Sequence, residues 1–228
     1  MSRETVLGSI RRGLHRGPLS AERQQELRAR LAKPPRHLIP ARSRLPQAEQ
    51  VALFMANLER EFASVERVAR AEEVPAALAG FLAAHNLPSA FAMAPHPALQ
   101  AIPWASRPML QIREGRAEAS DAVAVQHGYA GIAETGTLML PGGPERPTTL
   151  NLLADTAVVV LPCRRIVGAL EEAWDLLRAE HQDSAGGFMP RNVMLVTGPS
   201  RSADIESVLE LGAHGPRRLH VILIDPPA

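Results

Sequence analysis

The sequence predicts an α/β protein, a three-layer sandwich with a largely parallel central sheet, preceded by an N-terminal helical arm. Seven short apolar runs rich in β-branched residues are spread over residues 89–224, and helical patterns precede and separate them. These runs are almost continuously apolar, which is typical of strands buried on both faces. Residues 1–44 differ sharply, because they carry 11 basic and 3 acidic side chains.

Two helices are expected in the basic arm. Apolar residues at helical spacing predict a first helix over residues 6–14, ended by Gly17-Pro18, and a second over residues 20–31. The arm could dock on an acidic partner or on nucleic acid. Because it lacks the aromatic side chains that stack on bases, a solvated helix pair is the simpler interpretation and nucleic-acid binding is not expected.

A proline-rich connector follows the arm. Residues 33–46 contain four prolines and three arginines, a composition typical of an extended linker. We therefore predict two parts, a basic helical arm with its linker over residues 1–45 and an α/β domain over residues 46–228.

Helices and strands alternate through the predicted domain. We expect helices over residues 51–65, 74–85, 166–181 and 202–211. The expected strands are residues 89–93, 109–112, 123–126, 137–140, 156–161, 192–197 and 219–224.

Composition excludes several kinds of chemistry. The single cysteine, Cys163, allows no internal disulfide and cannot supply the thiolates of an iron–sulfur cluster, so any such cluster would belong to a partner. The single lysine, Lys33, lies in the linker, which argues against a Schiff base or a P-loop. The histidines lack paired metal-ligand spacing, and we predict no metal. No apolar run approaches the ~20 residues of a membrane span, and no secretory signal is visible, so we expect a cytoplasmic protein.

The most distinctive segment is residues 131–143, in which Glu134 is flanked by glycines and threonines just before a predicted strand. Glycines let the backbone approach a ligand closely, and hydroxyls can bind its polar groups. Glu134 could act as nucleophile, general base or ligand anchor, or it could simply bond to its own turn or to an arginine. The candidate ligand-binding residues here are Gly131, Thr135, Gly136 and Thr137.

Residues 193–206 form a second candidate segment, read as a strand, a tight turn and the start of a helix. A helix N-terminus attracts anions, and Arg201 could add a bidentate contact. Alternatively, the serines merely cap the helix and the acid complements its dipole. The candidates in this segment are Gly198, Pro199, Ser200, Arg201, Ser202 and Asp204.

The third segment, residues 211–218, joins the predicted helix to the last strand. Gly212 is expected as a helix C-cap, whereas His214 and Arg217 could add a proton donor and a cation, although a lone loop histidine is more often structural. Because loops at one end of a parallel sheet converge, we expect all three segments to form a single anion-binding pocket.

These three segments, residues 131–138, 197–206 and 212–219, together resemble the LUD-domain family, in particular its LutC/YkgG lactate-utilization group. The resemblance covers residues 45–228 and extends to the opening helix. It implies a fold of the NagB/RpiA/CoA-transferase-like type. It also implies a role in oxidising L-lactate to pyruvate beside iron–sulfur partners, LutA-like and LutB-like, with no cofactor held by this chain and a small carboxylate or phosphate as ligand.

A second interpretation is that the chain itself catalyses acyl or CoA transfer. Coenzyme A transferases of that fold group use a glutamate in a Glu-x-Gly turn as nucleophile, and Glu134-Thr135-Gly136 is similar to it. This is an analogy at the level of the fold. The sequence leaves open whether the chain is an enzyme.

Overall fold

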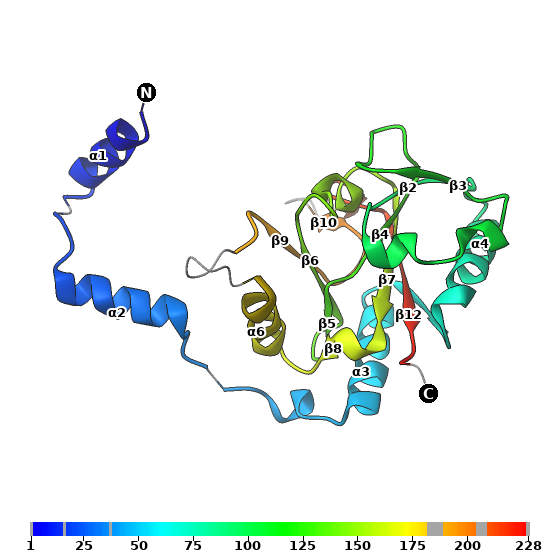
Figure 1. The fold of residues 1–228 in the computed structure, drawn as a ribbon, viewed down its shortest axis with the longest axis horizontal. Helices are drawn as coiled ribbons and strands as arrows, with labels where there is room; N and C mark the ends of the chain where they lie inside the picture. The colour runs from blue at the N-terminus through cyan, green and yellow to red at the C-terminus, as the bar shows by residue number, and fades with distance from the viewer. Residues whose placement is uncertain (1, 16, 37, 182–188, 204–208, 227–228) are drawn as a thin grey trace. The chain divides into compact units, whose positions relative to one another are not determined.

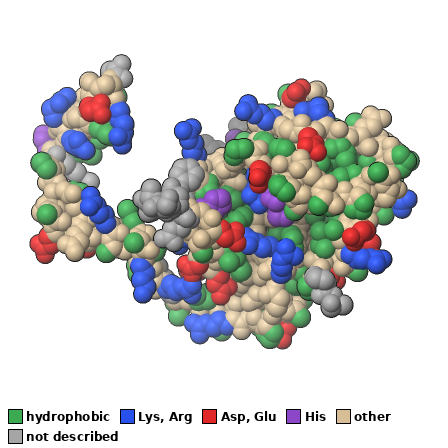
Figure 2. All heavy atoms as spheres, viewed as in Figure 1, with side chains coloured by type: hydrophobic (Ala, Val, Ile, Leu, Met, Phe, Trp, Pro, Cys, Tyr) green, Lys and Arg blue, Asp and Glu red, His purple; other side chains and the backbone are tan. Residues whose placement is uncertain are grey.

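The computed structural model describes residues 2–15, 17–36, 38–181, 189–203 and 209–226 (Figure 1). The chain divides into two compact units, Met1–Leu38 and Ile39–Ala228. The first unit contains the two predicted helices, α1 (Arg3–Gly13) and α2 (Ala21–Ala32). Serine hydroxyls cap both N-termini, and neither helix has a buried residue, so nothing inside this unit forms a core. Figure 2 shows basic side chains along this unit.

The second unit is built on a six-stranded sheet in which every pair of neighbouring strands is parallel. Its middle strands are buried on both faces: Val158 and Val160 of β7 pack on one side, and Val159 and Leu161 on the other. This confirms the predicted α/β class with a largely parallel central sheet. The strands in spatial order are β1 (Ser64–Val68), β12 (Arg218–Ile224), β7 (Thr156–Pro162), β4 (Val123–His127), β2 (Ala90–Met93) and β3 (Gln111–Glu114).

Different elements cover the two faces of this sheet (Figure 1). One face packs against α4 (Val74–Ala84) and α5 (Pro97–Gln100). The other face packs against α3 (Gln47–Arg60) and a second sheet, whose far side is covered by α6 (Leu170–His181). Short 3₁₀ helices lie at Ala41–Ser43, Ala71–Glu73, Trp104–Ser106, Thr148–Asn151 and Cys163–Arg165.

The second sheet is mixed, and the sequence analysis missed half of it. Its order is β8 (Ile166–Val167), β5 (Ala130–Ile132), β6 (Thr137–Pro141) and β9 (Val193–Val196), with antiparallel pairs on both sides of β6. Strands β8 and β5 have two and three residues, too few for a periodic pattern to reveal.

Three predicted helices need correction. The helix predicted over residues 51–65 ends at Arg60, because Phe62 has a positive φ of 69° and β1 then begins. The helix predicted over residues 166–181 begins only at Leu170. The helix predicted over residues 202–211 is wrong: β10 (Arg201–Ala203) and β11 (Leu209–Leu211) pair antiparallel there, and the residues between them lie outside the described part of the chain.

The linker is also shorter than predicted. Residues 39–45 belong to the second unit, although a boundary was expected after residue 45. Ser43 is buried, and its hydroxyl donates a hydrogen bond of 2.8 Å to the carboxylate of Glu134. A segment that appears in the sequence as a linker is therefore fixed to the domain by a buried polar contact.

Two truncations test this attachment. A chain beginning at Ile39 should have the same free energy of unfolding as the full chain, because α1 and α2 bury nothing within their own unit. A chain beginning at Pro46 should be less stable by about 1.5–3 kcal/mol, the usual value of a hydrogen bond to a charged group. Urea unfolding measures both. Equal stability of the two truncated chains would show that Ser43 contributes nothing, and aggregation of the longer one would place the arm in the core.

Candidate functional site

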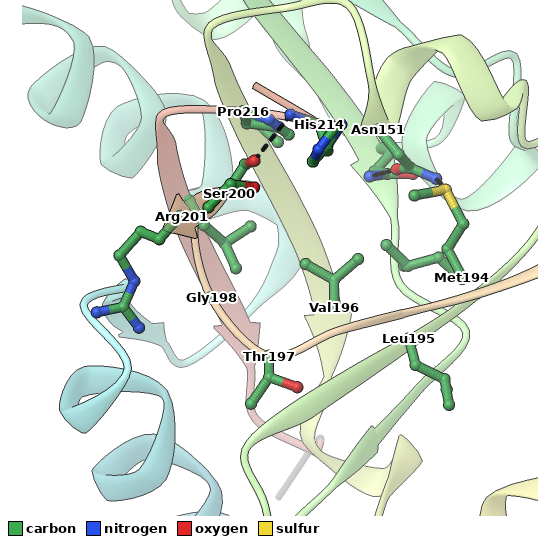
Figure 3. Close-up of a pocket in the computed structure, with 16 residues that line it drawn as sticks. Asn151, Met194, Leu195, Val196, Thr197, Gly198, Ser200, Arg201, His214 and Pro216 are labelled. Carbon is green, nitrogen blue, oxygen red and sulfur yellow. Dashed lines mark hydrogen bonds between the residues drawn. The ribbon is translucent and has the colours of Figure 1, made fainter. Parts of the chain in front are cut away.

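A pocket of about 280 Å³ lies between the central sheet and the second sheet (Figure 3). Its floor includes Ala157 and Leu219, which lie near the amino ends of β7 and β12. The remaining lining residues are Gln126, Leu140, Asn151, Met194, Leu195, Val196, Thr197, Gly198, Ser200, Arg201, Ser202, His214, Gly215 and Pro216. The pocket thus brings together residues of the second and third candidate segments.

Backbone hydrogen bonds join these two segments. Ser200 N–H donates to the carbonyl of Pro216 at 2.7 Å, and Gly212 N–H donates to the carbonyl of Ser200 at 2.9 Å. His214 N–H donates to the Ser200 hydroxyl at 3.1 Å (Figure 3). Ser200 is therefore the residue that holds the two loops together. Gly212, expected as a helix C-cap, instead lies in the turn after β11 with φ of +85°.

The physical setting of the pocket differs from the prediction. The loop before β12 and the start of β7 lie at the amino ends of parallel strands, not at the carboxyl ends where loops of open α/β sheets usually bind ligands. Residues 201–203 are a strand, so no helix begins at Ser202 as expected. In the described residues of this segment there is thus no helix N-terminus to bind an anion.

Arg201 lines the pocket, but its charge is already matched. Its guanidinium donates to the carboxylate of Glu61 at 3.1 Å and lies 4.2 Å from the centroid of the Phe62 ring. Figure 3 shows the side chain pointing away from His214 and Asn151. Arg201 thus holds the β9–β10 connection to the end of α3. It does not present a free cation to the pocket.

Glu134, unlike Arg201, does not line the pocket. One carboxylate oxygen accepts from the Ser43 hydroxyl at 2.8 Å, and the other accepts from Leu170 N–H at 3.0 Å. Leu170 is the first residue of α6, so a negative charge here complements the positive end of the helix dipole. Glu134 therefore connects the segment before α3, the β5–β6 turn and α6, and the expected shared pocket does not include its carboxylate.

Threonine hydroxyls connect the Glu134 turn to the pocket. The hydroxyl oxygens of Thr135 and Thr137 lie 2.7 Å apart. The hydroxyl oxygen of Thr137 lies 2.9 Å from that of Thr197, which lines the pocket. The two candidate glycines of this segment, Gly131 and Gly136, have packing roles. A methyl group on Gly131 would lie 2.9 Å from the Phe54 ring, and one on Gly136, which has φ of +67°, would lie 2.7 Å from Leu58 N.

The remaining candidates lie elsewhere. Pro199 is half-buried but is not among the lining residues. Arg217 is exposed and lies 3.8 Å from the carboxylate of Asp155. Asp204 lies outside the described residues.

Eleven of the 16 lining residues were not among the candidates, and three of these contact one another: Gln126, Asn151 and Met194. The Gln126 amide donates to Asn151 Oδ1, and Asn151 Nδ2 lies 3.5 Å from Met194 Sδ. A glutamine inside the apolar run of β4 was the signal that could have revealed them, because a buried amide needs a partner. The pocket offers amides, hydroxyls and His214 against an apolar wall, which suits a small ligand with both polar and apolar parts.

The described part of the chain contains neither a metal-binding group of side chains nor a reactive thiol. It contains no group of three or more His, Cys, Asp or Glu side chains that could hold a metal ion. The Cys163 thiol is buried, and burial followed by its hydrogen bond to Asp225 raises its pKa to about 11. The thiol is therefore protonated and unreactive near neutral pH.

A family model described as the LUD domain matches residues 51–224. Over 94 residues, the chain is 37% identical to "Lactate utilization protein C 1" of Bacillus mycoides, covering 41% of this chain and 39% of that protein. "Lactate utilization protein C" of Bacillus subtilis is 36% identical over 95 residues, covering 41% and 38%. An uncharacterized protein of Neisseria meningitidis is 40% identical over 96 residues, covering 42% and 39%. Each match thus spans about two-fifths of the curated relative.

Among solved structures, a DUF162 family protein from Deinococcus radiodurans has a similar fold, with a TM-score of 0.57. It is 22% identical in sequence, and the match covers 79% of this chain and 99% of that chain. At this identity the likeness shows the fold alone. None of the described helices is long and apolar enough to cross a membrane.

Proposed function

Since the chain belongs to the LUD domain family, we propose that it is a cytoplasmic subunit of an L-lactate utilization system and holds a small ligand in the pocket between the two sheets. Two observations support the proposal, one from the sequence relatives and one from the pocket. Relatives named lactate utilization protein C match the sequence, and the same chain folds two of its three distinctive segments around one pocket.

The chemistry of the lining favours a small carboxylate, with a phosphate as the other candidate. Asn151 and His214 can donate hydrogen bonds to an anionic group, while Met194 and Val196 face the carbon atoms of the ligand. Because Glu61 already balances Arg201, recognition of the anion depends on hydrogen bonds and on His214.

Electron transfer would be left to partner proteins. One buried thiol cannot hold an iron–sulfur cluster, so oxidation of lactate to pyruvate would need LutA-like and LutB-like subunits that carry the clusters. In this division of labour the present chain binds and positions a ligand beside its partners.

The alternative, acyl or CoA transfer through Glu134, receives no support from the geometry. A nucleophilic carboxylate needs a free oxygen facing a substrate, whereas each oxygen of Glu134 already accepts a hydrogen bond and neither faces the pocket. Absence of an acyl adduct on Glu134 after exposure to an acyl-CoA would agree with this.

The proposal is tested with the native complex, purified through a tag on this chain and assayed for L-lactate-dependent reduction of a dye. We expect iron–sulfur proteins to copurify, and omission of this chain to abolish the activity. His214→Ala should lower the rate at least about ten-fold, as loss of a hydrogen bond to an anion does. The exposed His214 side chain can be removed without disturbing the core.

Arg217→Ala is the matched control, because it alters the same loop outside the pocket and should leave the rate within about two-fold. Full lactate oxidation without this chain would overturn the proposed role. An unchanged rate with His214→Ala, in a complex that assembles normally, would overturn the pocket as the ligand site.

A further inference from the structure

A second group of polar side chains lies at the carboxyl edge of the central sheet, between β4 and β2. These neighbouring strands continue in opposite directions: the chain leaves β2 for α5 on one face and leaves β4 for β5 of the second sheet on the other. Such a reversal opens a crevice at the carboxyl ends of parallel strands, the usual position of ligands in open α/β sheets. His96 follows β2 and His127 ends β4, so both histidines lie at this point.

The contacts between these side chains are close. The rings of His96 and His127 are stacked, with centroids 4.0 Å apart and an interplanar angle of 5°. Arg146 Nη2 lies 2.7 Å from His96 Nε2 and 3.4 Å from His127 Nδ1. Figure 2 shows histidine side chains next to basic ones on the second unit.

This cluster has more hydrogen-bond donors than acceptors. His96 Nδ1 accepts the N–H of Ala98, at 3.2 Å, where it caps α5. Arg146 Nη2 can only donate, and it lies 2.7 Å from His96 Nε2, so Ala98 N–H and Arg146 compete for the single acceptor nitrogen of a neutral imidazole. Arg146 Nε is buried and has no hydrogen-bond partner in the described part of the chain. An added acceptor is needed to satisfy these donors.

The charge of Arg146 is unbalanced as well. Among the described residues, no carboxylate oxygen lies within 4.0 Å of its guanidinium; Glu145, which is 57% exposed, lies 3.9 Å from His96 Nε2. Glu180, the other nearby acid, is paired with Arg165 at 2.5 Å. Burial lowers the pKa of both histidines, that of His127 to about 3, so the positive charge of the cluster rests on Arg146. A half-buried arginine without a carboxylate favours binding of an anion.

We propose that His96, His127 and Arg146 bind the oxyanion group of a small ligand, a carboxylate or a phosphate, at the β2–β4 switch point. The site is separate from the pocket between the sheets, since none of these three residues lines that pocket. His96, whose side chain is 12% exposed, forms the edge from which a ligand enters. The oxyanion accepts from Arg146 and so relieves the competition of two donors for the His96 ring.

Calorimetric titration of the full chain with sodium phosphate and with sodium L-lactate, in a chloride background, tests the proposal. Binding of one salt and not the other identifies the class of oxyanion. We expect Arg146→Gln to weaken the binding at least about ten-fold. His96→Asn keeps an acceptor for Ala98 N–H but removes Nε2, and should also weaken the binding. Arg107→Gln, which removes an exposed arginine elsewhere, should not.

A thermal melt provides a second readout that does not depend on knowing the affinity. Without added oxyanion, Arg146→Gln should unfold at the same temperature as the wild type or higher, because it removes an unbalanced cation. The bound salt should raise the melting temperature of the wild type more than that of Arg146→Gln, in which only the pocket between the sheets remains to bind it. Absence of binding by both salts, or equal binding by wild type and folded Arg146→Gln, would overturn the proposal.

Discussion

Replacing Gly168 by alanine is expected to lower the free energy of unfolding of the domain by up to about 3 kcal/mol, among the larger effects of a single substitution. A methyl group on Gly168 would lie 1.8 Å from the carbonyl oxygen of Ser43, a contact that no rotation of a side chain can relieve. The substitution would push residues 41–43 away from the domain and break the bond between the Ser43 hydroxyl and Glu134. Urea unfolding of the purified chain measures the loss.

Two comparisons make this prediction specific. Gly80→Ala in α4 meets no atom within 4 Å and should stabilise the chain by up to about 1 kcal/mol, as alanine does in helices. In a chain that begins at Pro46, Ser43 is absent, so Gly168→Ala should cost far less than it does in the full chain. An equal cost in both chains would mean that the clash with Ser43 is not the cause.

The free energy of unfolding is also expected to fall as the pH drops from about 6.5 to about 4. Burial, followed by repulsion from nearby charges, lowers the pKa of His127 to about 3 and that of His220 to about 4. Both side chains stay neutral in the folded protein, whereas the unfolded chain takes up protons below about pH 6.5. The unfolded state therefore binds more protons, and acid favours it, by about 2 kcal/mol per histidine between pH 6.5 and 5.

The variant His220→Asn separates the two contributions. His220 is buried and stacks on Phe81 with centroids 3.9 Å apart, and its Nδ1 lies 2.8 Å from the Ser64 hydroxyl. Asparagine can keep the bond to Ser64 but does not titrate, so the variant should be less stable at neutral pH and lose less stability on acidification. The measurement is urea unfolding at several pH values without phosphate. An identical pH dependence in variant and wild type would show that His220 does not control it.

Periodicity and composition were sufficient where an element is long and packs with one repeated pattern. The apolar run of β7 and the alternation of its side chains between two cores follow from the strand repeat of two residues. They were not sufficient at β10 and β11, where a helix was predicted. Three residues contain too few repeats to separate a strand from a turn of helix, and only the pairing of Arg201 with Leu211 decides between them.

The roles of the candidate residues show the same limit. The sequence marked the loops around Ser200 and His214 as candidates, and the structure places both at one pocket without the carboxylate of Glu134. It could not assign Arg201, because its partner Glu61 is 140 residues away in the sequence. Arg146 escaped notice for a similar reason, since an arginine has no distinctive pattern until burial removes it from water.

The sequence by itself therefore determined the α/β class, the positions of the long strands along the chain, the LUD-domain resemblance and the presence of only one cysteine. These properties depend on local pattern and on composition. Only the tertiary structure decided that Glu134 bonds to Ser43 and Leu170, that Arg201 is balanced by Glu61, and that two histidines meet Arg146 at the edge of the sheet. The charge and hydrogen bonding of a side chain depend on neighbours that are distant in the sequence and come together only when the sheets pack.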